Sequence, residues 1–214
     1  MLSSAERKAR SEEICRSEGI PVHPTLPLVE NEKETRLRNV ESVAWRAMCL
    51  CLVAMKGEGM PHQELLEIVD GFGLGSHFSP HEHAFVSNDF PTQDDLDIFS
   101  WRYECYWVLL WALGFLNDLG RPDKQCDVEC AVDILWQSKT TNMFIGSAKL
   151  RSISEILDSL DLTYRYDWAC VEARMNGNPV PGELHFRVVY ERHYALNWIV
   201  NYMDQEWDDI TCDT

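Results

Sequence analysis

The chain has 214 residues, of which 45% are hydrophobic and 25% charged, and eight are tryptophans. This composition is typical of a globular protein and excludes the weakly hydrophobic, highly charged class that stays disordered. The 19 basic and 35 acidic residues give a net charge of −16 at pH 7. Such a charge argues against nucleic acid and anionic membranes as partners and favours cationic partners. The alternative interpretation is that the charge serves only to keep the protein soluble.

The N-terminus, MLSSAERKAR, contains neither an apolar segment nor a signal-peptide cleavage site, so we expect a cytoplasmic protein. The eight cysteines include no CxxC pair, and most lie within apolar helical patterns. In a reducing compartment such cysteines usually act as small buried hydrophobic side chains.

The first third of the chain is expected to contain three helices and a strap. Ser3 and Glu6 have the spacing of a capping box, which predicts a charged, mostly exposed helix within residues 1–19. Three prolines in seven residues predict a polyproline-like strap over residues 20–38. Asn39 is the N-cap of a second, buried helix that ends at Gly57. A short third helix follows, bracketed by a proline and a glycine.

Residues 73–91 are rich in Gly, Ser, Pro and Asn and show no sustained period, which predicts a long loop. Three histidines, His77, His81 and His83, surround Glu82 in this segment. They are candidate ligands of a divalent metal ion, but no distant ligand pattern matches them. We therefore expect no metal there.

Residues 92–117 are predicted to form the central helix of the fold, with Thr92 as its N-cap and Gly120 after its end. Residues 105–116 carry no charged side chain, and apolar groups cover every side of the helix. This apolar run is shorter than the roughly 17–25 residues that a membrane span requires. The segment should therefore be a buried core helix.

Three more helices are predicted in the last part of the chain. Asp127 caps the fifth, a capping box at Ser152 opens a sixth that reaches Met175, and the seventh covers about residues 184–203. An acidic tail, residues 204–214, follows. The start of the seventh helix, LHFRVVY, is the one segment that could instead be a strand. The whole chain, residues 1–214, is thus expected to be a single all-α domain of about seven helices.

Helical periodicity places five charged side chains toward the core: Arg46, Arg102, Glu104, Asp167 and Arg192. An isolated buried ion is very costly, so the three arginines should pair with the two acids and with backbone carbonyls. In particular, Glu104 or Asp167 should be the partner of Arg192.

Two interpretations of these charges stay open. One is a buried salt-bridge network that fixes the register of the helices. The other is an active site assembled from Glu104, Asp167, Glu191, Arg192 and His193, because perturbed ionisable groups cluster at such sites. The chain has no Gly-rich phosphate loop, no GxSxG and no HExxH motif.

Four segments, WRYECYWVLLWALGFL, LRSISEILDSLDLTYRYDWA, VVYERHYALNW and WDDITCDT, resemble in this order the bacterial family called domain of unknown function 4272. With LRNVESVAWRA added, the similarity extends from about Gly19 to the C-terminus. The resemblance implies no established activity, cofactor or catalytic residue. The residues that match the family pattern are Trp101, Arg102, Glu104, Arg165, Trp168, Glu191, Arg192, His193, Asn197, Trp198 and Asp208.

Three functions therefore remain open, and none needs a cofactor. The charge favours a non-catalytic binding protein, for instance an immunity-like inhibitor of a basic protein. The buried cluster favours a hydrolase or transferase, with or without a metal ion. The third possibility is a structural domain. We expect no nucleic acid or membrane partner, and the sequence leaves the oligomeric state open.

Overall fold

The computed structural model describes residues 2–214, and every regular element in that range is helical. The α-helices are α1 (Ser4–Ser17), α2 (Val40–Gly57), α3 (His62–Phe72), α4 (Pro80–Ser87), α5 (Gln93–Ser100), α6 (Arg102–Ala112), α7 (Val128–Ser138), α8 (Thr141–Ser147), α9 (Ile153–Met175) and α10 (Phe186–Ile199). Three single-turn 3-10 helices, η1 (Pro181–Glu183), η2 (Tyr202–Asp204) and η3 (Trp207–Asp209), flank α10. The predicted all-α single domain is confirmed, with more and shorter helices than expected.

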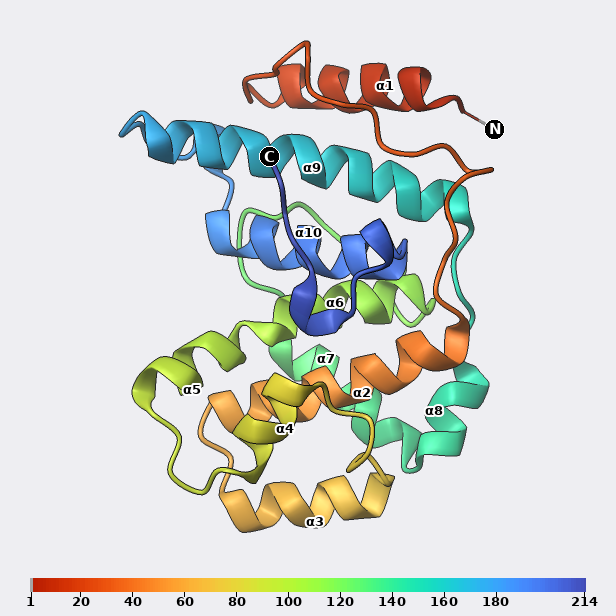
Figure 1. Ribbon diagram of the computed structural model, residues 1–214, viewed down its shortest axis with the longest axis vertical. Helices are drawn as coiled ribbons and strands as arrows, with labels where there is room; N and C mark the ends of the chain where they lie inside the picture. Colours follow the sequence, from red (N-terminus) through yellow and green to blue (C-terminus); the bar gives the residue numbers. More distant parts are fainter. Residues whose placement is uncertain (1) are drawn as a thin grey trace.

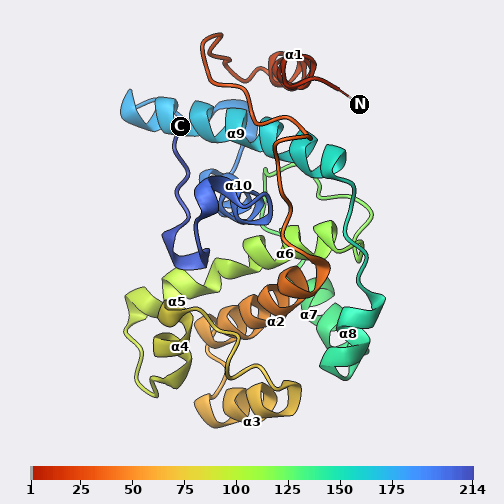
Figure 2. The same ribbon diagram turned by 45° about the vertical axis from the view of Figure 1, so that its right-hand side comes forward.

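The longest helices form a stack in which each one contacts the next. Figure 1 shows the order α1, α9, α10, α6, α2 and α3 from top to bottom, and Figure 2 shows the same order after a rotation. The shorter α4, α5, α7 and α8 surround α2 at the lower end of the stack. Helices far apart in the chain, such as α1 and α9, therefore lie side by side.

Helix α6 occupies the centre of this stack, between α10 and α2. Leu110 and Leu113 are almost completely buried, and Trp107 is half-buried against the core. The prediction that the chain is organised around this segment is thereby confirmed. Within residues 2–214, no helix combines the length and the apolar character that a membrane crossing requires.

The predicted helix over residues 92–117 is divided into two, because the chain bends at Trp101 between α5 and α6. The bend lets the end of α5 pack tightly against the end of α2. A Cβ atom added at Gly57 would lie only 2.8 Å from the Cα atom of Ser100. Helix periodicity along one segment carries no information about such a contact between two helices.

Helix α6 also ends earlier than predicted, before Gly114 rather than near Gly120. Gly114 has φ +80°, a left-handed conformation that glycine adopts without strain. The backbone amides of Lys149 and Arg151 donate to the carbonyl oxygens of Leu113 and Ala112, at 2.9 and 2.8 Å. These bonds satisfy carbonyl groups that the helix end leaves free.

The predicted loop over residues 73–91 contains a helix, α4, which corrects that prediction. Ser79 and Glu82 form a capping box, and Pro80 occupies the first turn, where its missing N–H costs nothing. Helix α8, capped by Thr140, was likewise not predicted. Both helices are short, and the turn-forming residues before and after them hide the helical pattern.

Candidate functional site

The charged candidates form two arginine–glutamate ion pairs and one histidine–aspartate contact rather than one cluster. Arg192 Nε lies 3.5 Å from Glu104 Oε2, Arg102 Nη1 lies 2.8 Å from Glu191 Oε2, and His193 Nδ1 lies 2.8 Å from Asp167 Oδ2. The prediction that Glu104 or Asp167 is the partner of Arg192 is confirmed, and the partner is Glu104.

The Glu104–Arg192 pair has backbone hydrogen-bond partners in the segment between α6 and α7. Glu104 Oε1 accepts the backbone N–H of Cys126 at 2.6 Å, and Arg192 Nη1 donates to the carbonyl of Gly120 at 2.7 Å. The pair therefore fastens the irregular segment between α6 and α7 to the two central helices. Burial lowers the pKa of Arg192, and the nearby Glu104 carboxylate opposes that shift.

Arg46 pairs with an acid that sequence analysis did not place in the core. Its guanidinium binds the carboxylate of Glu82 on α4, which is almost completely buried. Another buried pair, Asp161 with Arg165 at 2.6 Å, was also missed. Glu82 was missed because the glycines and prolines around it favour a loop over residues 73–91. Asp161 was missed because it lies outside the main apolar stripe of α9.

The three candidate histidines contact different parts of the molecule. The His77 ring stacks on the indole of Trp45 with centroids 3.6 Å apart, and His81 Nδ1 lies 3.7 Å from Asp208 Oδ2. Burial lowers the pKa of His77, and the charge of Arg46 lowers it further. His83 is exposed on α4.

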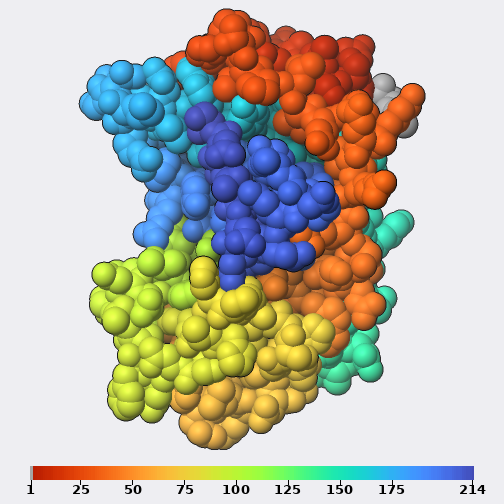
Figure 3. Space-filling view, in the orientation of Figure 1, coloured from red at the N-terminus to blue at the C-terminus, as the bar shows by residue number. Residues whose placement is uncertain are grey.

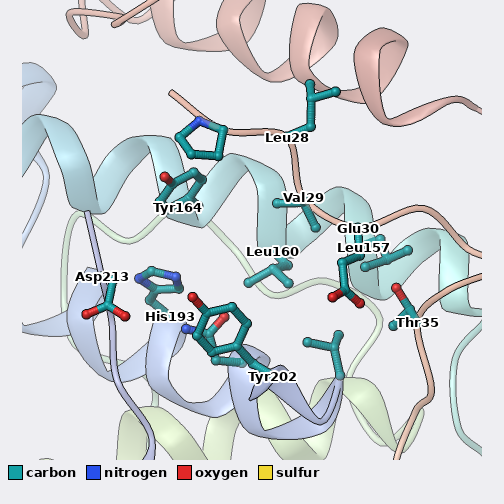
Figure 4. Close-up of a pocket in the computed structure, with 13 residues that line it drawn as sticks. Leu28, Val29, Glu30, Thr35, Leu157, Leu160, Tyr164, His193, Tyr202 and Asp213 are labelled. Carbon is teal, nitrogen blue, oxygen red and sulfur yellow. The ribbon is translucent and has the colours of Figure 1, made fainter. Parts of the chain in front are cut away.

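A cavity of about 360 Å³ lies between the N-terminal strap, α9, α10 and the C-terminal tail. Figure 4 shows its walls: Leu28 and Val29 from the strap, Leu160 from α9, and His193 from α10. The residues that line it are Pro27, Leu28, Val29, Glu30, Thr35, Leu157, Leu160, Tyr164, His193, Asn197, Val200, Tyr202 and Asp213. Sequence analysis predicted the strap and the tail but not that they share a cavity.

The polar groups of the cavity carry acidic charge only. Glu30 and Asp213 supply carboxylates, and within the described part of the chain no lysine or arginine lines the space. Burial raises the pKa values of the phenols of Tyr164 and Tyr202, so both stay protonated near neutral pH and can donate hydrogen bonds.

His193 connects this cavity to the interior of the bundle. Its imidazole is 3% exposed and lines the cavity, while Nδ1 contacts the buried carboxylate of Asp167. A carboxylate at Nδ1 fixes the orientation of the ring, and in the neutral form it favours the tautomer whose Nε2 accepts a proton. Of the predicted candidates, His193 is the one whose side chain reaches both a buried acid and the cavity.

The C-terminal tail is held in place by specific hydrogen bonds. Asn197 Nδ2 donates to the carbonyl of Thr211 at 3.0 Å, and the Thr211 amide donates to Gln205 Oε1 at 3.1 Å. These contacts position Asp213 at the cavity and Cys212 beside α9. Figure 3 shows this segment, in the darkest blue, on the surface of the molecule.

A second hollow, of about 840 Å³, lies on the other side of the tail. Asp167, Glu191 and Cys212 line it together with three arginines, Arg102, Arg174 and Arg187. Although burial alone would lower the pKa of Arg102, the adjacent Glu191 carboxylate raises it, so the guanidinium stays charged.

Comparison with known proteins gives one match. A family model described as Domain of unknown function (DUF4272) matches residues 7–210, which is nearly the whole chain. No curated protein and no solved structure matches this chain.

Proposed function

We propose that this chain, which belongs to the family Domain of unknown function (DUF4272), binds a small organic cation in the cavity beneath the strap. One observation carries the proposal: the cavity has apolar walls and two carboxylates, and within residues 2–214 no lysine or arginine lines it. An amine with an apolar portion complements such a surface.

The size and the aromatic groups of the cavity support this ligand class. About 360 Å³ falls near the lower end of the roughly 300–1,000 Å³ range that is usual for small-molecule sites. Tyr164 and Tyr202 offer ring faces and protonated hydroxyl groups, and ring faces attract ammonium groups. Val29, Leu160 and Val200 would contact the apolar part of the ligand.

A second candidate function, a hydrolase or transferase, is favoured by the His193–Asp167 contact at 2.8 Å. With Nδ1–H directed at Asp167, Nε2 of a neutral His193 can accept a proton from a hydroxyl or amine of the bound ligand. This second function depends on the first proposal, because the general base acts on the ligand bound in the cavity.

The net charge of −16 also supports a basic protein as a partner, and this remains a proposal that rests on charge alone. The eight free cysteines support a reducing compartment such as the cytoplasm.

The ligand class is tested with two probes of one skeleton and opposite charge, 3-phenylpropylamine and 3-phenylpropionate, titrated by NMR and calorimetry. The amine should bind and shift the resonances of His193 and Tyr164, and the carboxylate should bind at least about fivefold more weakly. Glu30→Gln should weaken amine binding.

Glu34→Gln is the matched control, since it removes the same charge from an exposed neighbour that does not line the cavity. Equal weakening by Glu30→Gln and Glu34→Gln would show non-specific attraction by the acidic surface. Preference for the carboxylate would refute the proposed ligand class.

A further inference from the structure

Three side chains from three separate elements converge between the two hollows: Asp167 from α9, His193 from α10 and Cys212 from the C-terminal tail. Each offers one donor atom, and these atoms all lie within 4.8 Å of one another. Asp167 and His193 are buried, and Cys212 is half-buried. A carboxylate, an imidazole and a thiol are all common ligands of transition metals.

An independent observation points to an occupant of this site. Asp167 is 1% exposed, and although its Oδ2 contacts His193, its Oδ1 has no hydrogen-bond partner among residues 2–214. A buried carboxylate oxygen without a partner costs free energy, so such oxygens in folded proteins are normally satisfied by a donor or a cation.

Carboxylates lie around the three donor atoms. Asp167, Glu191 and Asp213 line the second hollow beside Cys212. Arg102, which also lines it, is already paired with Glu191. A divalent cation at the three donor atoms would supply the missing partner of Asp167 Oδ1.

We propose that Asp167, His193 and Cys212 bind one zinc ion. The mixed sulfur, nitrogen and oxygen donor set suits Zn²⁺ and disfavours Mg²⁺ and Ca²⁺, which bind oxygen almost exclusively. Tetrahedral zinc places neighbouring donor atoms about 3.3–3.8 Å apart. The separations of up to 4.8 Å therefore have to contract by about 1 Å, and the 2.8 Å contact between His193 and Asp167 has to open by about 0.5 Å. Cys212 lies on the irregular tail, which can supply this movement.

Three protein ligands leave the fourth position of the ion open. Because Asp167 and Cys212 line the second hollow, water or an anion can reach this position from solvent. Because a cysteine binds metal as the thiolate and a histidine as the neutral imidazole, zinc uptake should release protons. The site joins the tail to α9 and α10, and it shares His193 with the first cavity.

The test uses full-length protein without a polyhistidine tag, stripped of metal by a chelator. Zinc is titrated in competition with a chromogenic chelator, and Co²⁺ is added separately as a spectroscopic probe. We expect one zinc per chain and a cobalt spectrum with a thiolate charge-transfer band. Cys212→Ser should abolish that band and weaken zinc binding at least about tenfold.

Three further variants keep the outcome decisive. Asp167→Asn preserves the shape of the side chain and should also weaken binding at least about tenfold, with folding checked by circular dichroism. Cys130→Ser removes an exposed cysteine and His81→Ala removes a histidine of α4, and both should bind zinc like the parent.

Absence of saturable zinc binding, or parent-like binding by Cys212→Ser, would overturn the proposal. Loss of zinc in His81→Ala with retention in Cys212→Ser would likewise overturn it and place the metal at α4. The amine titration has its own probes and its own variant, Glu30→Gln, which is not a zinc ligand, so the two proposals fail separately.

Discussion

Arg192 and Glu104 meet across the interface of α10 and α6, with Nε of the arginine 3.5 Å from Oε2 of the glutamate. Both side chains are at least 96% buried. They line neither the first cavity nor the second hollow, and we expect their charges to act in the packing of the two central helices.

Removal of one member of this pair should be strongly destabilising. Arg192→Ala leaves the Glu104 carboxylate without its cation, and the free energy of unfolding should fall by about 3–5 kcal/mol in denaturant titrations. Arg10→Ala removes a guanidinium that is 65% exposed from an ion pair with Asp158, and it should cost less than about 1 kcal/mol. A loss below 1 kcal/mol for Arg192→Ala would contradict the scaffold role.

The close approach of α5 and α2 gives a paired prediction for two glycines. Gly57→Ala should destabilise the protein by about 1–3 kcal/mol, because the new methyl group meets the backbone of Ser100. Gly71→Ala, in α3, meets no atom within 4 Å and should be neutral or stabilising by up to about 1 kcal/mol. Melting temperatures of the two variants that change in the same direction would contradict this account.

The stacking of His77 on Trp45 predicts a pH dependence of stability. The pKa of His77 is lowered in the folded state, so between this pKa and the unfolded value of about 6.5 the unfolded chain binds more protons. Its contribution is complete above about pH 6.5 and is lost as pH falls through the folded pKa. The difference in unfolding free energy between pH 7.5 and pH 5.5 should therefore be smaller in His77→Gln than in the parent.

The control for this experiment is His83→Gln, which removes an exposed histidine of the same segment. If His77→Gln and His83→Gln change the pH dependence equally, the stacking contact is not its cause.

The anchor of the C-terminal tail can be tested without any ligand. Asn197→Ala removes the donor to the Thr211 carbonyl, so the amides of residues 211–214 should exchange their hydrogens about five- to tenfold faster. Asn176→Ala, at the exposed end of α9, is the control and should leave exchange in the tail unchanged. Unchanged exchange in Asn197→Ala would show that other contacts hold the tail.

Local signals in the sequence predicted the starts of several helices correctly. Ser3 and Ser152 both form the capping boxes that their spacing indicated. The same spacing at Ser79 and Glu82 was overlooked, because the glycines and prolines around it favour a loop. Capping depends on three or four consecutive residues, which is why it can be read without knowledge of the fold.

The candidate site could be predicted only in part. Helical periodicity placed Asp167 and Arg192 in the interior correctly, because it depends on one helix at a time. It could not assign Asp167 to His193, or Arg46 to Glu82, since pairing depends on how separate helices are rotated and offset. The cavity was missed because its walls include irregular segments, where no period indicates which side chains face inward.

The strap and the tail that wall the first cavity are separated by most of the chain, with Val29 in one and Asp213 in the other. During synthesis the strap, α9 and α10 all emerge before Asp213, so this wall of the cavity forms after the others. The cavity is therefore complete only once synthesis has reached Asp213.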